Sequence, residues 1–140
     1  MIAIPYLACM IATARYYHLP PRVLPAIHRV EGGAVGTVHH NTDGTDDFGV
    51  MQINARWVAP LAQFARMPEV AVRLRLIGDA CFNIAAAGAI LRTYLDAERG
   101  DLMRAIGDYH SHTPALNLSY QAEVLGAAWT MFGNATASRR

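Results

Sequence analysis

The stretch Val30-Glu31-Gly32-Gly33 ends a segment, residues 21–31, whose pattern predicts a helix. Within this segment Leu24, Ile27 and Glu31 follow the i, i+3, i+7 spacing of a stripe that faces a protein core. A carboxylate at the end of an apolar stripe is unusual, because burying an unpaired charge is costly. Glu31 is therefore the first candidate for a functional side chain.

Two glycines follow Glu31 and mark the end of the expected helix. Gly32 and Gly33 suit the left-handed conformation with which many helices end. We expect a Glu31 carboxyl that is held at the helix end, partly desolvated and facing a cleft. Desolvation raises the pKa of a carboxyl group, which a general acid needs near neutral pH. The alternative is a Glu31 side chain that points to solvent, and this stretch alone favours that alternative.

The composition is that of one folded domain. The chain has 140 residues, of which 53% are hydrophobic and 16% are charged, so it can bury a core and is not expected to be disordered. The net charge is +1 and there is no basic run, which argues against a nucleic-acid partner. No apolar stretch is long enough to cross a bilayer, and residues 85–91 with their flanks are expected to form a buried helix.

The N-terminal segment and the two cysteines bear on the compartment. Residues 1–14 are apolar and Ala12-Thr13-Ala14 resembles a cleavage site, but the positively charged start of a signal peptide is missing. We therefore expect a first helix there and find no evident export signal. Cys9 and Cys81 could be two buried thiols in a reducing compartment or one disulfide in an oxidising one, and composition does not decide.

The chain as a whole predicts a mainly α domain over residues 1–134, with one small β-hairpin between residues 35 and 54 and a frayed tail at 135–140. The turn of the hairpin is Asp43-Gly44. Helices are expected at residues 2–17, 21–31, 55–64 (capped by Asn54 and disturbed by Pro60), 69–76, 80–98 (capped by Asp79), from the Asp101 cap to Tyr109, and at 115–132.

Four further groups carry chemically useful side chains. In the segment from Phe48 to Asn54, Gly49 lets the backbone approach a ligand, and Gln52 and Asn54 offer amides; a plain strand with a polar edge is the alternative. Cys81-Phe82-Asn83-Ile84 is expected to pack a helix terminus.

The other two groups lie nearer the C-terminus. Tyr109, His110 and Ser111 combine an aromatic ring with polar groups at a helix end, which suits a sugar. Tyr120 lies in the last expected helix, where a lone tyrosine usually belongs to the core.

Taken together and in this order, the groups resemble the family 1 lytic transglycosylases, lysozyme-like enzymes that cleave the glycan strands of peptidoglycan. The resemblance covers residues 6–125 and is greatest to the small specialised members of type III and type IV secretion, conjugation and pilus systems. Two positions depart from the family: Gly32 stands where a serine commonly follows the catalytic glutamate, and His110 stands where many members have asparagine.

The resemblance implies a lysozyme-like fold and a reaction that needs no cofactor or metal. It makes Glu31 the catalytic acid and base, and it implies a periplasmic monomer with a Cys9–Cys81 disulfide. The implied partners are peptidoglycan strands and components of a secretion, conjugation or pilus apparatus. The residues implied to bind or position the substrate are Gly49, Met51, Gln52, Asn54, Tyr109, His110, Ser111 and Tyr120.

Three other functions are kept open. A hydrolytic muramidase would need a second carboxylate, for which Asp46 and Asp47 are placed on the hairpin, although we expect both to be solvated loop acids. A non-catalytic wall-binding module would keep the cleft without turnover. A metal protein is the third, but the possible ligands fit no compact zinc or calcium signature: His39, His40, Asp43, Asp46, Asp47, His110 and His112.

Overall fold

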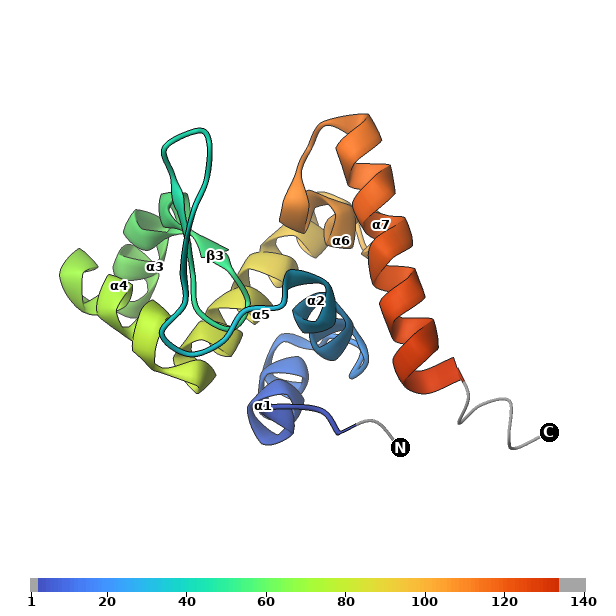
Figure 1. Ribbon diagram of the computed structural model, residues 1–140, viewed down its shortest axis with the longest axis horizontal. Helices are drawn as coiled ribbons and strands as arrows, with labels where there is room; N and C mark the ends of the chain where they lie inside the picture. Colours follow the sequence, from blue (N-terminus) through green and yellow to red (C-terminus); the bar gives the residue numbers. More distant parts are fainter. Residues whose placement is uncertain (1–2, 134–140) are drawn as a thin grey trace.

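The computed structural model describes residues 3–133, and it confirms the expected mainly α fold with a small antiparallel sheet (Figure 1). The expected tail at 135–140 lies outside the described residues. The helices are α1 Leu7–Tyr17, α2 Val23–Glu31, α3 Val58–Ala65, α4 Glu69–Gly78, α5 Ala80–Ala97, α6 Leu102–His110 and α7 Pro114–Ala128. A short 3-10 turn, η1 Ala55–Trp57, precedes α3, and a π turn, η2 Trp129–Gly133, follows α7.

The sheet has one strand more than the expected hairpin. Strands β1 Val38–His40 and β2 Asp46–Phe48 form the hairpin, with His40 opposite Asp46. A third strand, β3 Ile53–Asn54, pairs antiparallel with the other edge of β2. The chain reverses between β2 and β3 through the turn at residues 49–52, in which Gly49 and Gln52 both have positive φ. This reversal turns the chain back along β2, so that residues 53–54 can pair with it as a third strand.

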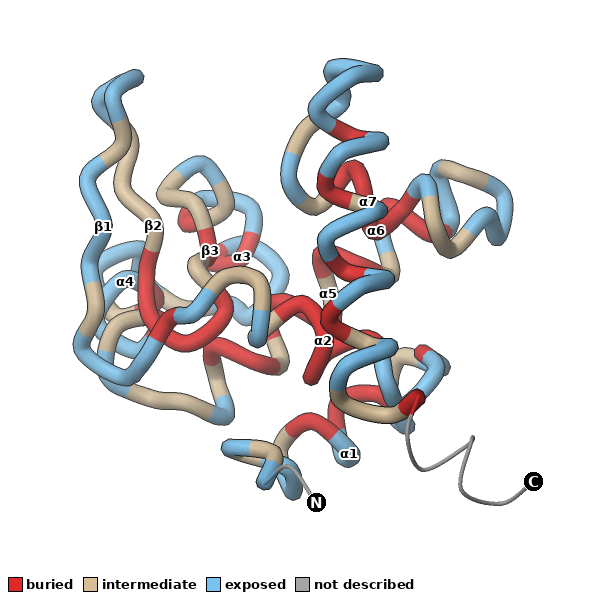
Figure 2. Tube along the Cα trace, turned by 45° about the vertical axis from the view of Figure 1, so that its right-hand side comes forward, coloured by how far each residue is buried: buried red, intermediate tan, exposed pale blue. Residues whose placement is uncertain are grey.

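Helix α5 is the central element around which the others pack. It contacts α1, α2, α4 and α6, while α7 packs on α2 and α6 (Figure 1). The buried parts of the trace gather along α5, α2 and the turn after β2 (Figure 2). The expectation of a buried helix over residues 85–91 is confirmed, since Ile90 and Leu91 are both buried. The sheet stands on one side of this core, and α6 and α7 stand on the other (Figure 1).

The expected caps are confirmed, and the helix boundaries differ at proline. The side chains of Asn54, Asp79 and Asp101 each accept a hydrogen bond from a backbone N–H in the following turn. Residues 21–22 form a turn, so α2 begins at Val23. The expectation that Pro60 disturbs a helix is wrong. Pro60 lies in the first turn of α3, where a backbone N–H would have no intrahelical partner, so its absence costs no hydrogen bond.

The N-terminal helix is tied covalently to the centre of the fold. Cys9 of α1 and Cys81 of α5 form a disulfide, with their Cα atoms 5.3 Å apart, which confirms the expected pairing. Over residues 3–133 no single helix is long and apolar enough to cross a membrane; α4 and α5 reach that length only as a pair, and they are bent by 110°.

Candidate active site

Glu31 is the last residue of α2, and the local structure explains its position. Ile27 and Leu24, one and two turns earlier, are fully buried and fix the face of the helix. Gly32 has φ of 69°, so the helix ends in the left-handed conformation expected of it. At Gly33 a Cβ atom would lie 2.1 Å from the Gly49 carbonyl oxygen, so this residue must be glycine for the turn at residues 49–52 to pack beside it.

The Glu31 carboxyl is partly desolvated and has one strong partner. The Tyr120 hydroxyl donates a hydrogen bond of 2.6 Å to Glu31 Oε2. Burial raises the pKa of Glu31 to about 7, the bond from Tyr120 opposes this rise, and the charges of Asp47 and Glu123 add to it. The alternative of a solvent-directed carboxyl therefore does not hold. Near neutral pH this group can both give and take a proton.

Two tyrosines complete the inner wall of the site. Tyr109 donates a 2.7 Å hydrogen bond to the Met51 carbonyl, so it joins α6 to the turn at residues 49–52. Burial raises the pKa of both Tyr109 and Tyr120, and the charge of Glu31 raises each further. Both phenols therefore stay protonated and act as hydrogen-bond donors. The His110 ring stacks on Tyr120, with centroids 5.0 Å apart and planes inclined by 12°.

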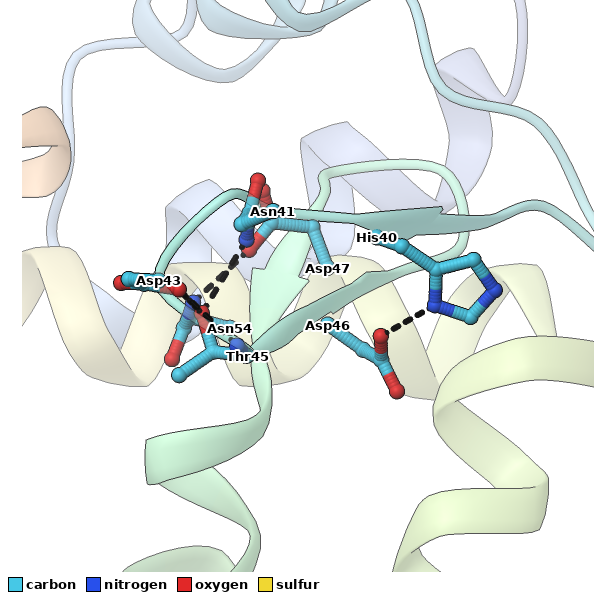
Figure 3. A network of polar contacts seen from close by, with 7 residues as sticks. All are labelled: His40, Asn41, Asp43, Thr45, Asp46, Asp47 and Asn54. Carbon is cyan, nitrogen blue, oxygen red and sulfur yellow. Dashed lines mark hydrogen bonds and ion pairs between the residues drawn. The ribbon is translucent and has the colours of Figure 1, made fainter.

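The opposite wall is the hairpin, whose polar side chains form a connected network (Figure 3). Asn54 Nδ2 donates to Asp47 Oδ1 at 3.0 Å and to Thr45 Oγ1 at 2.9 Å. The Thr45 hydroxyl in turn donates to Asp43 Oδ1 at 2.6 Å. The two neighbouring aspartates are thus separated: Asp47 is held by Asn54 on the cleft side, whereas Asp46 pairs with the exposed His40.

A cleft of about 700 Å³ lies between the hairpin and the α6–α7 corner. Five of the sequence-predicted residues line it: Glu31, Gln52, Asn54, Tyr109 and His110. Its other lining residues are His39, His40, Asn41, Thr42, Asp43, Asp47, Ile53, Arg56, Trp57, Ile90 and Leu116. A second groove, of about 640 Å³ between α1 and α5, has no carboxylate, imidazole or amide in its lining, so the first cleft is the candidate site.

The remaining predicted residues do not line the cleft: they are buried beneath its wall or lie outside it. Gly49 and Met51 are buried in the turn, so Met51 can contribute only backbone atoms. Tyr120 is buried and reaches the site through Glu31. Ser111 does not line the cleft; it is the C-cap of α6, and its hydroxyl accepts a hydrogen bond from the Thr113 N–H.

The sequence patterns do not point to several residues that the fold brings to the site. Trp57 and Leu116 supply apolar surface in the cleft, and Arg56 supplies a positive charge. None of them has a local signature, because each enters the cleft only through the packing of η1 and α7. The sequence points to Gln52 by its amide, but its left-handed φ of 53° is a strained feature that the sequence does not reveal. Its Nε2 donates to the Gly49 carbonyl at 3.0 Å.

The arrangement as a whole is suited to acid–base chemistry on a polar, extended substrate. One carboxyl group with a pKa near neutral faces a cleft that contains two further carboxylates, Asp43 and Asp47, together with amides and aromatic rings. Among residues 3–133 no group of three histidine, cysteine or acidic side chains could hold a metal ion. In the comparison with known proteins, neither a family model nor a curated protein matches this chain.

Proposed function

We propose that this protein is a lytic transglycosylase that cleaves the bond between N-acetylmuramic acid and N-acetylglucosamine in peptidoglycan and leaves 1,6-anhydro ends. The observation that carries the proposal is the Glu31 carboxyl, which is half-buried in the cleft, bonded to Tyr120, and has a pKa of about 7. Such a group can serve first as a general acid and then as a general base at neutral pH. The motif order described above supports the same assignment by resemblance.

The reaction that we propose needs one proton to be moved twice. Protonated Glu31 gives its proton to the leaving oxygen as the bond from that oxygen to C1 of the muramic acid breaks. The transition state has oxocarbenium character, and by family likeness the N-acetyl group assists this step. The Glu31 carboxylate then takes the proton of the sugar's own C6 hydroxyl while O6 bonds to C1. Glu31 is thereby reprotonated, and no water is consumed.

The remaining cleft residues would bind and orient the glycan. Gln52 and Asn54 present amides at the hairpin wall, and the rings of Tyr109, His110 and Trp57 offer surfaces on which sugars can pack. In this role Tyr120 keeps Glu31 oriented, since its hydroxyl donates a hydrogen bond to one oxygen of the carboxyl group. The absence of a hydroxyl at Gly32 removes one polar contact that the family commonly has near the sugar.

We further propose that the protein works in the periplasm, where it opens the wall locally for a secretion, conjugation or pilus machine. The Cys9–Cys81 disulfide supports an oxidising compartment, because such bonds are rare in the reducing cytosol. The choice among these machines rests on the resemblance alone. No cofactor or metal takes part in the proposed reaction.

A hydrolytic muramidase is the second candidate, and one observation favours it. Asp47 lies in the same cleft as Glu31, and Asn54 holds its carboxylate in place. A second carboxylate is what a hydrolase uses to activate water or to form a covalent intermediate. We rank this candidate second because Asp47 also has a simpler effect, which is to raise the pKa of Glu31 by its charge.

Digestion of purified sacculi, followed by mass spectrometry of the released muropeptides, separates the candidates. A lytic transglycosylase gives 1,6-anhydro ends, whereas a muramidase gives reducing ends that are one water heavier. If the sacculi are bound without release of either product, the protein is a non-catalytic wall-binding module. We expect anhydro ends.

A further inference from the structure

Asn83 is a fully buried polar residue in the first turn of α5, away from the substrate cleft. Its side-chain amide makes three hydrogen bonds. Oδ1 accepts from the Met51 N–H at 2.8 Å, and Nδ2 donates to the carbonyl oxygens of Phe48 at 2.8 Å and Leu76 at 2.9 Å. The buried amide thus uses both of its donor hydrogens, and its partners belong to two segments, residues 48–51 and helix α4. A buried amide with this many bonds specifies one arrangement of the groups around it.

The amide is inserted into a chain reversal. Phe48 and Met51 are the first and fourth residues of a four-residue segment, and in an ordinary β-turn the first carbonyl would accept directly from the fourth N–H. Here Asn83 satisfies both groups instead, and the backbone turn closes one residue later, where the Gln52 N–H donates to the Gly49 carbonyl at 3.2 Å. Gly49 makes this possible, because a Cβ atom at that position would lie 2.6 Å from Asn83 Nδ2 and 2.3 Å from the Leu76 carbonyl oxygen.

This reversal contacts the catalytic side of the cleft in two places. Its Met51 carbonyl accepts the hydrogen bond from Tyr109, which lines the cleft. Its Gly49 and Val50 carbonyls pack against Gly33, so closely that no side chain fits there. Gly33 lies two residues after Glu31, so the turn packs directly against the end of α2 that carries the carboxyl group. Asn83 is therefore linked to Glu31 and to Tyr109 through one shared element.

We propose that Asn83 is a positioning residue for catalysis: by bridging Phe48 and Met51 it fixes the turn against which Glu31 and Tyr109 are placed. The inference rests on the function proposed above for Glu31. It assigns a role in catalysis to a buried residue that does not touch the substrate. Its link to Glu31 and Tyr109 runs through the turn, whereas its third bond, to the Leu76 carbonyl, ties α5 to α4.

Asn83→Ala should impair turnover more than binding. The variant removes the hydrogen bonds that Asn83 makes to the Met51 N–H and to two carbonyl groups, so the turn is expected to relax and admit water. A misplacement of about 1 Å in a catalytic group can lower the rate by about 10²-fold. We expect a loss of that order in kcat with little change in KM, and a pKa of Glu31 that falls from about 7 towards its ordinary value as the carboxyl becomes more hydrated.

Ile84→Ala is the matched control, because Ile84 is the next residue of α5, is equally buried and makes no side-chain hydrogen bond to the turn. Both variants lose stability, and circular dichroism at a temperature where both are folded allows them to be compared. Carboxyl-carbon NMR titration of Glu31 and steady-state kinetics on solubilised glycan strands are the readouts. The control should keep the wild-type Glu31 titration and nearly the wild-type kcat.

Two outcomes would overturn the proposal. One is an Asn83→Ala protein with the kcat and the Glu31 titration of the wild type, and the other is an Ile84→Ala protein with the same losses as Asn83→Ala. If Asn83→Ala does not fold, amide hydrogen exchange in the wild type decides: the Met51 N–H should be as protected as the amides of α5, and loop-like exchange would refute the bridge. A wild type without glycan cleavage would refute the proposed function, while the titration and exchange still test Asn83.

Discussion

The hydroxyl of Tyr120, in α7, lies 2.6 Å from Oε2 of Glu31, at the end of α2, and this bond joins two elements that are 89 residues apart in the chain. The same contact stabilises the ionised carboxylate, and it is outweighed by the desolvation that raises the pKa of Glu31. The balance between these two effects places the titration of Glu31 near neutral pH. The predictions below follow from that balance and from the residues that set it.

Replacing Tyr120 with phenylalanine should raise the pKa of Glu31 above about 7, because the hydrogen bond that favours the carboxylate is lost while burial remains. A hydrogen bond to a charged group contributes about 1.5–3 kcal/mol, and this stabilisation is lost for the carboxylate that forms as Glu31 gives up its proton. Activity at neutral pH should therefore fall by at least about tenfold. The pH–rate profile would show the shift. Tyr16→Phe is the control, since Tyr16 is 73% exposed and lies on α1. A profile for Tyr120→Phe that moves to lower pH would contradict this reading.

Glu31→Gln should make the protein more stable than the wild type at alkaline pH. The folded-state pKa of Glu31 is about 7 against an ordinary value of 4.5, so between these values the folded state binds more protons than the unfolded state. The free energy of unfolding of the wild type therefore falls as pH rises from 4.5 to about 7, by about 3 kcal/mol in all. The glutamine variant lacks this loss. Urea unfolding at pH 4 and pH 8 checks it, and equal pH dependence in the two proteins would be inconsistent with a buried Glu31.

Asp47→Asn should lower the pKa of Glu31, because the negative charge of Asp47 is one of the causes of the rise. The variant should keep most of its transglycosylase activity, since the substrate's own hydroxyl is the nucleophile. Asp46→Asn is the natural control, as Asp46 is the next residue and its carboxylate pairs with exposed His40 instead. Kinetic assays of both variants on sacculi are decisive here. An inactive Asp47→Asn beside an active Asp46→Asn would favour the muramidase.

Loss of the disulfide should destabilise the fold without changing the site. Cys9 and Cys81 are 72 residues apart, and closing a loop of this size contributes about 4 kcal/mol in the chain-entropy account. The double variant Cys9→Ser/Cys81→Ser should therefore unfold at a lower urea concentration and still cleave glycan when folded. Thiol titration of protein exported without reductant should find no free thiol, and two titratable thiols would exclude the bridge in solution.

The sequence could predict features that depend on local chemistry. The helix that ends at Glu31 and Gly32, and the caps at Asp79 and Asp101, follow from residue type and spacing, and all are found in the structure. The reversal between β2 and β3 was not expected, because it needs a left-handed Gln52 and an amide supplied by Asn83 from a distant helix.

In the candidate site, too, local sequence predicts some features, whereas others depend on how distant helices pack. Strand alternation separates Asp46 from Asp47, but only the packing of α6 and α7 beside the hairpin decides that Asp47 is on the cleft side. The motif around Tyr109 predicts a substrate contact for Ser111, yet the end of α6 directs its hydroxyl to the backbone of Thr113. Tyr120 could have been a plain core residue, and its bond to Glu31 appears only once α7 crosses α2.

The most direct test of the central claim is the muropeptide pattern of sacculi digested by the wild type and by Glu31→Gln. The claim is that one carboxyl group, without a water-activating partner, cleaves the glycan. We expect 1,6-anhydro ends from the wild type, and a loss of about 10²- to 10⁴-fold in their yield from a folded, glycan-binding Glu31→Gln protein. Reducing ends from the wild type, or undiminished cleavage by Glu31→Gln, would contradict the account.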